Sequence, residues 1–415
     1  MLRSIRKNPC LDKLRNALHK VWKDEMKKER HHLFPPDAPA ASNPKTAVVV
    51  AEFDPFGGPY KNFLRIVRTL VGSGYSVDVF PTGPDYPELT YIAEETGKVR
   101  IHSSFIPRKK SQGQFKIFRY VSEARFLAKW LRAQRLDACV MVFSITSPGR
   151  FLWRYPRKTR QIYIFRSNPE GRLHRLAGPW FRLLAGQEVR LLGVSQATAR
   201  ALATSWGFRK FDPRFGYLRN PGAAEGQPLA TFSSSPKQVL MVGRLHENKN
   251  PFFWLYVAKA VTERTREKVR FVWLGDGELR DEAISYAEKI GISGLVSFPG
   301  FTKDPYPVYR QSFLYLHLAK VEPLGNAVVD ALAMGIPSVV SDIGGLPEIV
   351  QDGVNGRTVG IDSVSHAADA VVDIIENEEK HANMALAARQ VFEERFSSSV
   401  WEAQFLTKIG YDSPK

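Results

Sequence analysis

Short apolar runs alternate with longer amphipathic stretches from residue 46 onward. This alternation predicts buried strands joined by helices, the pattern of an α/β fold with parallel sheets. A helix is predicted at 61–71, and helical spacing also continues over 365–395 and 397–409. The runs predicted as strands are 46–53, 75–80, 138–143, 161–165, 189–194, 238–243, 269–274, 313–318 and 338–341.

The segment 313–350 contains one complete unit of this kind. Residues 313–318 predict a strand, 319–326 a loop, and the following residues a helix that ends near Gly335, before the strand at 338–341. A strand, helix and strand in this order form a parallel crossover. The loop therefore opens at the carboxyl edge of a sheet, where α/β folds bind their ligands.

This loop and the start of its helix carry candidate binding groups. A helix that begins near Asn326 leaves the amides of Gly325, Asn326 and Ala327 without partners inside the helix, and such amides suit a phosphate. Glu322 precedes them and Asp330 follows. Carboxylates beside a phosphate are good acceptors for sugar hydroxyls, so the pattern fits a nucleotide-sugar. An ordinary loop with solvated acids is the simpler alternative.

Residues 322–350 resemble the donor-binding signature of retaining GT-B glycosyltransferases of family four, also called glycosyl transferases group 1. That family carries two acidic residues separated by seven, then Ala-x-Ala-x-Gly-x-Pro and Ser-Asp-x-Gly-Gly-x-Pro-Glu. Glu322 matches the first acid, and Asp330 stands where the second is usually glutamate. The resemblance implies two doubly wound, Rossmann-like domains facing each other across a cleft. It also adds Leu324 to the expected donor site.

A second loop resembles the diphosphate clamp of this family. Gly-Arg-Leu with a lysine five residues after the arginine gives Arg244 and Lys249. A diphosphate leaving group gains charge as the glycosidic bond breaks, so two fixed cations stabilise it most in the transition state. A solvated basic loop is the alternative. By the same resemblance Gly275 belongs to the donor site, and Phe301 lines the nucleobase pocket.

The first half of the chain contains fewer residues that match motifs of this family. Gly57 and Gly58 follow the first predicted strand, and such a pair lets backbone approach a phosphate closely, as in the Gly-rich loop of the family. The family often carries a histidine after a central strand of this domain. Here Arg166 follows the strand at 161–165, so either Arg166 faces the donor phosphates or the functional residue is another, such as His174.

We expect a reaction without a covalent intermediate and without a metal. No residue of the N-terminal half stands out as a nucleophile, which favours a front-face reaction assisted by the departing phosphate. No Asp-x-Asp cluster occurs between the domains, so Arg244, Lys249 and the helix amides would replace a metal. The expected catalytic residues are Glu322, Arg244, Lys249 and Arg166. No cofactor is expected beyond a UDP-, GDP- or ADP-sugar as donor.

The predicted domains follow from the pattern and the resemblance together. Residues 1–45 contain a basic amphipathic helix at 1–33 and a Pro-rich linker. This helix either binds a membrane surface or packs on the body of the protein. An acceptor-side domain is expected at 46–220, completed by the last helix at 397–415. The nucleotide-sugar domain is expected at 221–396.

Charge and cysteines limit the partners. The net charge is +17, and residues 100–190 hold 20 Lys and Arg against 4 Asp and Glu, whereas 221–415 hold 19 against 25. Such a basic half attracts nucleic acid, an anionic membrane or a phosphorylated acceptor. Cys10 and Cys139 have no metal-ligand spacing, and a reducing compartment fits them. No stretch has the length of a signal peptide core or a membrane span, which favours a soluble or peripheral protein.

The leading hypothesis is a retaining, metal-independent glycosyltransferase. Its acceptor would be a membrane-associated or polyanionic glycan, such as a lipopolysaccharide, lipid-linked or cell-surface polysaccharide precursor, and it would work on the inner face of the cytoplasmic membrane. One alternative is a cytosolic transferase that acts on a small phosphorylated acceptor. A nucleic-acid-binding protein is the other, but it gives the acidic pair and the clamp no purpose, and no groove-reading module is present. We therefore expect no nucleic-acid partner.

Overall fold

The computed structural model describes residues 45–51, 58–81, 87–102, 116–134, 139–145, 155, 159–167, 178–179, 181, 188–208, 212–231 and 235–410. Contacts within the chain separate Met1–Pro44 from a compact unit, Lys45–Lys415, and only the second unit contains described residues. The predicted N-terminal amphipathic helix, Gly57 and His174 lie outside the described residues.

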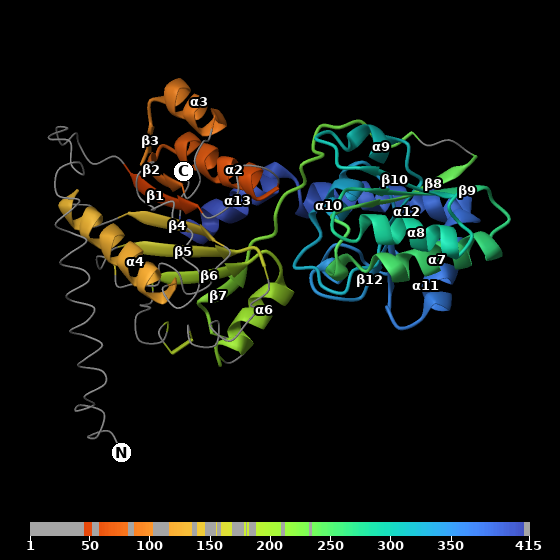
Figure 1. Ribbon diagram of the computed structural model, residues 1–415. Helices are drawn as coiled ribbons and strands as arrows, with labels where there is room; N and C mark the ends of the chain where they lie inside the picture. Colours follow the sequence, from red (N-terminus) through yellow and green to blue (C-terminus); the bar gives the residue numbers. More distant parts are fainter. Residues whose placement is uncertain are drawn as a thin grey trace, which may run out of the picture. The chain divides into compact units, whose positions relative to one another are not determined.

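The first part of this unit is a seven-stranded sheet with the strand order β3-β2-β1-β4-β5-β6-β7 (Figure 1). Every pairing is parallel. Parallel sheets are covered on both faces, which explains why most residues of their strands are apolar. The strands are β1 (Thr46–Ala51), β2 (Ser76–Pro81), β3 (Val99–Ile101), β4 (Val140–Ile145), β5 (Arg160–Phe165), β6 (Val189–Gly193) and β7 (Phe215–Tyr217).

Helices cover both faces of this sheet. Successive side chains of a strand point to opposite faces, and β1 shows this directly. Val49 belongs to the core that includes buried side chains of α2 (Gly58–Gly72), α3 (Pro87–Thr96) and α13 (Ser398–Ile409), whereas Val48 and Val50 belong to a second core with side chains of α4 (Lys116–Ala133) and α6 (Gln196–Ser205).

The second part is a six-stranded parallel sheet with the order β10-β9-β8-β11-β12-β13. Its strands are β8 (Lys237–Val242), β9 (Val269–Leu274), β10 (Val296–Gly300), β11 (Leu314–His317), β12 (Ser338–Ser341) and β13 (Gly356–Val359). Its helices are α7 (Pro251–Arg264), α8 (Arg280–Lys289), α9 (Tyr306–Arg310), α10 (Asn326–Ala333), α11 (Val364–Ile375) and α12 (Glu378–Arg395), with the short turns η2 (Glu247–Lys249) and η3 (Leu346–Glu348). One continuous apolar core holds them together.

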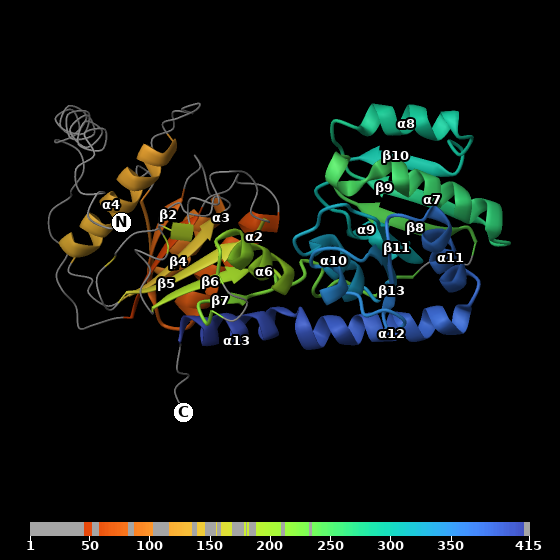
Figure 2. The same cartoon turned by 90° about the horizontal axis from the view of Figure 1, so that it is seen from below.

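The chain returns to the first sheet at its C-terminal end (Figure 2). The buried apolar side chains of α12, such as Val391 and Phe392, belong to the core of the second sheet. Those of α13, namely Trp401, Phe405 and Ile409, belong to the core that contains β1 and α2. The two consecutive helices therefore join both sheets. Among the described residues, no helix combines the length and apolarity needed to span a bilayer.

The predicted fold class is confirmed, because both sheets are parallel and doubly wound. Two local predictions need correction. Helix α2 begins at Gly58 instead of residue 61, so Gly58 opens the helix and does not belong to a loop. The helical pattern over 365–395 is divided into α11 and α12 at Asn377, whose side chain accepts a hydrogen bond of 2.9 Å from Lys380 N.

Candidate active site

The loop between β11 and α10 forms one wall of the candidate site. Gly325 precedes the helix with φ 109°, a conformation that other residues rarely adopt, and a Cβ there would lie 2.8 Å from Leu346. The carbonyl of Gly325 accepts from Val328 N and Val329 N. Within the described part of the chain, the amides of Asn326 and Ala327 have no hydrogen-bond partner. They remain available to an anion, as the sequence predicted.

Glu322 lies buried in this loop and contacts two other polar side chains. Its Oε2 atom is 3.0 Å from His317 Nε2 and also pairs with Lys249 Nζ. Burial raises the pKa of Glu322, but the hydrogen bond from His317 and the charge of Lys249 outweigh it and lower the pKa to about 2. Glu322 is therefore ionised at neutral pH and can accept hydrogen bonds from a ligand.

His317 ends β11 behind this carboxylate. Burial, together with the charge of Lys249, lowers its pKa, so the imidazole is neutral. An ionised carboxylate only accepts, so Nε2 carries the proton and donates to Glu322. The buried Nδ1 atom finds no hydrogen-bond partner among the described side chains and backbone groups.

Two glycines hold the backbone of Glu322 from the other side. Gly345 N donates to the carbonyl of Glu322 at 3.0 Å. Gly344 has φ 57°, and a Cβ on it would lie 2.0 Å from the same carbonyl oxygen. The Gly-Gly pair of the sequence motif is therefore required for this close approach between the two loops.

The predicted clamp loop lies on the other side of Glu322. Lys249 ends η2, and the Asn248 carbonyl accepts from Lys320 N at 2.8 Å, which ties the clamp loop to the Glu322 loop. The side chain of Arg244 is 70% exposed and pairs with Glu278 at 3.0 Å. Glu278 also lies 3.3 Å from His246 Nε2. Of the two cations of the predicted clamp, Lys249 therefore contacts the Glu322 carboxylate, whereas Arg244 lies at the exposed edge of the site.

Most of the predicted site residues line two adjoining cavities, and Glu322 and Pro323 line both of them. The larger has a volume of about 320 Å³ and is lined by Ser167, Arg244, His246, Asn248, Lys249, Val321, Glu322 and Pro323. The smaller, of about 110 Å³, is lined by Arg166, Val194, Asn220, Glu322, Pro323, Leu324, Gly325 and Asn326. Residues of the first sheet, such as Arg166, therefore face the predicted donor loop.

Asp330 is half-buried and contacts the segment between the two sheets. Its Oδ1 atom accepts from Ala223 N at 2.6 Å and Ala224 N at 3.0 Å. Burial raises its pKa to about 6, in spite of both hydrogen bonds. One oxygen of this predicted acceptor for sugar hydroxyls is thus engaged by the protein itself. A contact of Asp330 with the ribose, which the family resemblance implies, stays a prediction.

The predicted residues Gly58, Gly275, Phe301 and Ala327 also lie outside the lining of both cavities. Gly275 follows β9 and forms an isolated bridge with Gly300. Phe301 follows β10 and is 75% exposed. A nucleobase role for Phe301 stays a prediction.

Sequence reasoning missed several residues of the site. His317 carried a signal, since it is the one polar side chain in the apolar run 313–318. His246 and Asn248 lie between the two clamp cations and also line the larger cavity. Ser167 could not be found from the pattern, because only the packing of the first sheet brings it to the second.

The chain is similar to several known proteins. Residues 230–391 match the family model described as glycosyl transferases group 1. The chain is similar to N-acetyl-alpha-D-glucosaminyl L-malate synthase of Bacillus anthracis, with 30% identity over 155 residues that cover 37% of this chain and 40% of that protein. It is also similar to the lipopolysaccharide core biosynthesis glycosyltransferase LpsE of Rhizobium meliloti, with 31% identity over 176 residues that cover 42% and 50%. The matched regions thus span half or less of these relatives.

The fold also matches solved structures. Anabaena HepE, solved in complex with UDP and glucose, has a TM-score of 0.65 and 17% identity, covering 89% of this chain and 100% of that chain. At this identity the likeness concerns the fold, which is the two-domain GT-B architecture.

Proposed function

We propose, from the match of residues 230–391 to the model of the glycosyl transferases group 1, that the protein is a retaining glycosyltransferase. It would move a sugar from a nucleoside-diphosphate sugar to a glycan acceptor. The observation that carries the proposal is the meeting of Glu322, Lys249 and Arg244 with the free amides of α10 around adjoining cavities. Cations, amides and an ionised acceptor together suit a diphosphate attached to a sugar.

Each group has a role that follows from its chemistry. The amides of Asn326 and Ala327 would bind a phosphate at the positive end of α10. Lys249 and Arg244 would stabilise the charge that develops on the diphosphate. Glu322 would accept a hydrogen bond from a sugar hydroxyl, since its low pKa keeps it ionised. Because Lys249 pairs with Glu322, a bound phosphate would share this cation with the carboxylate.

In the proposed reaction, the bond between the anomeric carbon and the diphosphate oxygen breaks. The acceptor oxygen forms the new bond on the same face of the sugar, so the configuration is retained. The acceptor proton passes to an oxygen of the departing diphosphate, which balances the step without a covalent enzyme intermediate. We further propose that Lys249, Arg244 and the α10 amides neutralise the leaving group without a metal.

We propose a membrane-associated or polyanionic glycan as acceptor, reached from the inner face of the cytoplasmic membrane. Two observations support this: the excess of 16 positive charges between residues 100 and 190, and the similarity to a lipopolysaccharide core enzyme. A small phosphorylated acceptor in the cytosol would be attracted by the same charge and is the second candidate.

A thermal-shift panel of UDP-, GDP- and ADP-sugars, with and without a chelator, tests the donor site. A ligand at one hundred times its dissociation constant stabilises the native state by about 2.7 kcal/mol. We expect one nucleotide class to raise the melting temperature and the chelator to leave the shift intact. A shift that disappears with chelator would contradict the metal-independent mechanism, and a panel without any shift would contradict the donor site.

A further inference from the structure

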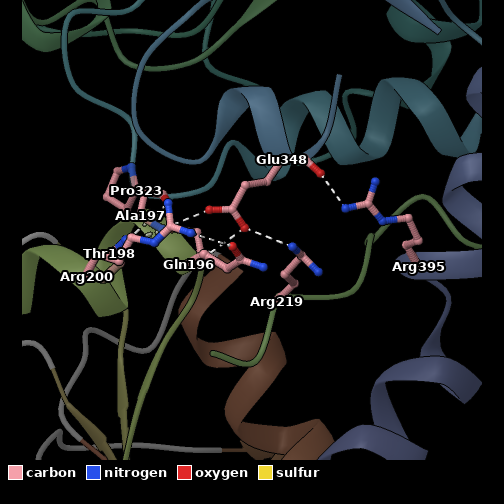
Figure 3. A network of polar contacts seen from close by, with 9 residues as sticks. Gln196, Ala197, Thr198, Arg200, Arg219, Pro323, Glu348 and Arg395 are labelled. Atoms are coloured by element: carbon pink, nitrogen blue, oxygen red, sulfur yellow. Dashed lines mark hydrogen bonds and ion pairs between the residues drawn. The ribbon is translucent and has the colours of Figure 1, made fainter. Parts of the chain in front are cut away.

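Glu348 joins the second sheet to a helix of the first (Figure 3). It is the last residue of η3, and η3 directly follows the glycine pair that contacts the backbone of Glu322. One carboxylate oxygen accepts from Ala197 N at 2.9 Å and the other from Gln196 N at 3.0 Å. Both amides belong to the first turn of α6. A carboxylate of one domain therefore occupies the helix N-terminus of the other.

The local chemistry explains why this contact is favourable. The first amides of a helix have no partner inside it, and Ser195 satisfies only that of Thr198, at 3.0 Å. Glu348 supplies acceptors for the amides of Gln196 and Ala197, and negative charge suits this end of the helix dipole. Arg219 adds an ion pair at 2.9 Å, with side chains only 11% and 15% exposed. Limited exposure reduces screening by water and salt.

The same helix end contacts the candidate donor loop. Ser195 Oγ donates to the carbonyl of Pro323 at 2.5 Å, and Thr198 Oγ1 lies 3.3 Å from that oxygen. Pro323 directly follows Glu322. The N-terminus of α6 is therefore fixed to the second domain at two places, at Glu348 and at the donor loop.

We propose that Glu348 is a positioning residue, and we call Glu348, Arg219 and the amides of Gln196 and Ala197 the interdomain latch. The latch holds α6 against the loop 322–325 and so fixes the distance between the walls of the donor cavities. Val194 and Asn220, which line the smaller cavity, are the sequence neighbours of Ser195 and Arg219. The consequence for catalysis rests on the proposed function.

The contacts of Glu348 argue against a direct role in ligand binding. Both carboxylate oxygens already accept hydrogen bonds from α6, and Glu348 lines neither of the two cavities. Arg395 donates to the Glu348 carbonyl at 2.8 Å and so fixes its backbone within the second domain. The backbone of Glu348 is thus bound within the second domain, and its carboxylate binds the first domain.

Hydrogen exchange tests the latch itself. In Glu348→Ala the amides of Gln196 and Ala197 lose their acceptor, and we expect their exchange to accelerate by about tenfold or more, while helix α7, which packs on the core of the second sheet, keeps its protection. Glu348→Gln retains an acceptor oxygen without the charge, and an intermediate rate is expected. Glu379→Gln, at an exposed position of α12, is the matched control and should exchange like the wild type. Unchanged exchange at Gln196 and Ala197 in a folded Glu348→Ala variant would overturn the latch.

Kinetics test the positioning role. Titration with UDP, GDP and ADP should give a dissociation constant within about threefold of the wild type in Glu348→Gln, because the clamp and the α10 amides are untouched. We expect kcat to fall about 10- to 100-fold, since the opposing wall is no longer held in place. If the amides of Gln196 and Ala197 exchanged faster in Glu348→Gln but kcat were unchanged, the latch would be a structural contact only, and the positioning role would be overturned. If the wild type turns over no donor at all, the proposed function fails, and the exchange measurement still decides the latch.

Discussion

Glu322 is restrained at both its side chain and its backbone before any ligand arrives. His317 and Lys249 hold the carboxylate, and Gly345 N holds the carbonyl. A site that is already oriented loses little free energy on binding, which is how preorganised groups favour a transition state. The resemblance to the family motifs pointed to Glu322 and Lys249, but it could not show that the two side chains pair directly.

Replacing Glu322 by glutamine tests its charge. Glu322→Gln keeps the size of the side chain but removes the counter-ion of Lys249 and the acceptor for a sugar hydroxyl. We expect turnover to fall by about 10²–10³-fold, the usual cost of losing one preorganised polar group, with an unchanged circular dichroism spectrum. Glu247→Gln, an exposed carboxylate of the same clamp loop that pairs with Lys320, is the control and should retain activity. Wild-type turnover in Glu322→Gln would remove Glu322 from the mechanism.

Asp330 makes stability depend on pH. Its folded pKa of about 6 exceeds the ordinary value of 3.8, so the native state binds the proton more tightly than the unfolded state. This group therefore contributes stability at low pH, and the contribution is lost as pH rises from about 4 to 6. In Asp330→Asn this part of the pH dependence should disappear. Urea unfolding at several pH values in this window measures it, with the fully exposed Asp281→Asn as control. If the free energy of unfolding of Asp330→Asn changed with pH as steeply as that of the wild type, the raised pKa of Asp330 would be contradicted.

The contacts of Asp330 also show a limit of sequence reasoning. Its position after Glu322 matched a donor-binding motif, but its partners Ala223 and Ala224 are about a hundred residues away. Only tertiary packing brings them together. The same holds for Glu348, which stood in a recognised motif without any indication that its carboxylate would cap a helix of the other domain.

Elements were predicted well where their pattern was strong. The strand, loop, helix and strand around Glu322 appear as β11, α10 and β12, because apolar runs and a helix-ending glycine mark their limits. Short or half-polar elements such as β13 and α8 have weaker patterns and were not predicted. The start of α2 was placed too late, because Gly58 and Pro59 resemble a loop although proline suits the first turn of a helix.

The glycine pair before η3 provides a test at this scale. Gly344→Ala places a Cβ 2.0 Å from the Glu322 carbonyl oxygen at a positive φ, so the donor loop must shift. Backbone strain of this kind costs about 1–3 kcal/mol, and we expect lower stability and a loss of nucleotide binding together. Gly353→Ala also has a positive φ but meets nothing within 4 Å, so it should lose stability and retain binding. Equal nucleotide affinity in Gly344→Ala and wild type would contradict the role of this turn.

For the whole molecule, the sequence predicted the two-sheet architecture through the family motif and the alternation of apolar runs. The exchange of a helix between cores was expected only by resemblance, since Trp401 and Phe405 look like any other apolar helix face. The uneven distribution of charge is also a property of the whole chain, and it is one argument for the proposed kind of acceptor.

The basic segment 100–190 and the amphipathic segment 1–33 predict binding to anionic membranes. Each Lys or Arg near such a surface contributes about 1 kcal/mol, and salt screens this attraction, with a Debye length of about 10 Å at 0.1 M and 3 Å at 1 M. We expect the full chain to co-sediment with phosphatidylglycerol vesicles at low salt and to be released at high salt. Deletion of residues 1–33 should weaken binding. Equal co-sedimentation with neutral phosphatidylcholine vesicles would assign the charge to an acidic acceptor instead.

The structure of the complex with the nucleoside diphosphate that stabilises the protein most would test the donor site directly. We predict that phosphate oxygens lie within about 3.2 Å of the amides of Asn326 and Ala327, and that Lys249 and Arg244 contact the diphosphate. A diphosphate bound away from the start of α10, or bound there without contact to either cation, would contradict the proposed donor site.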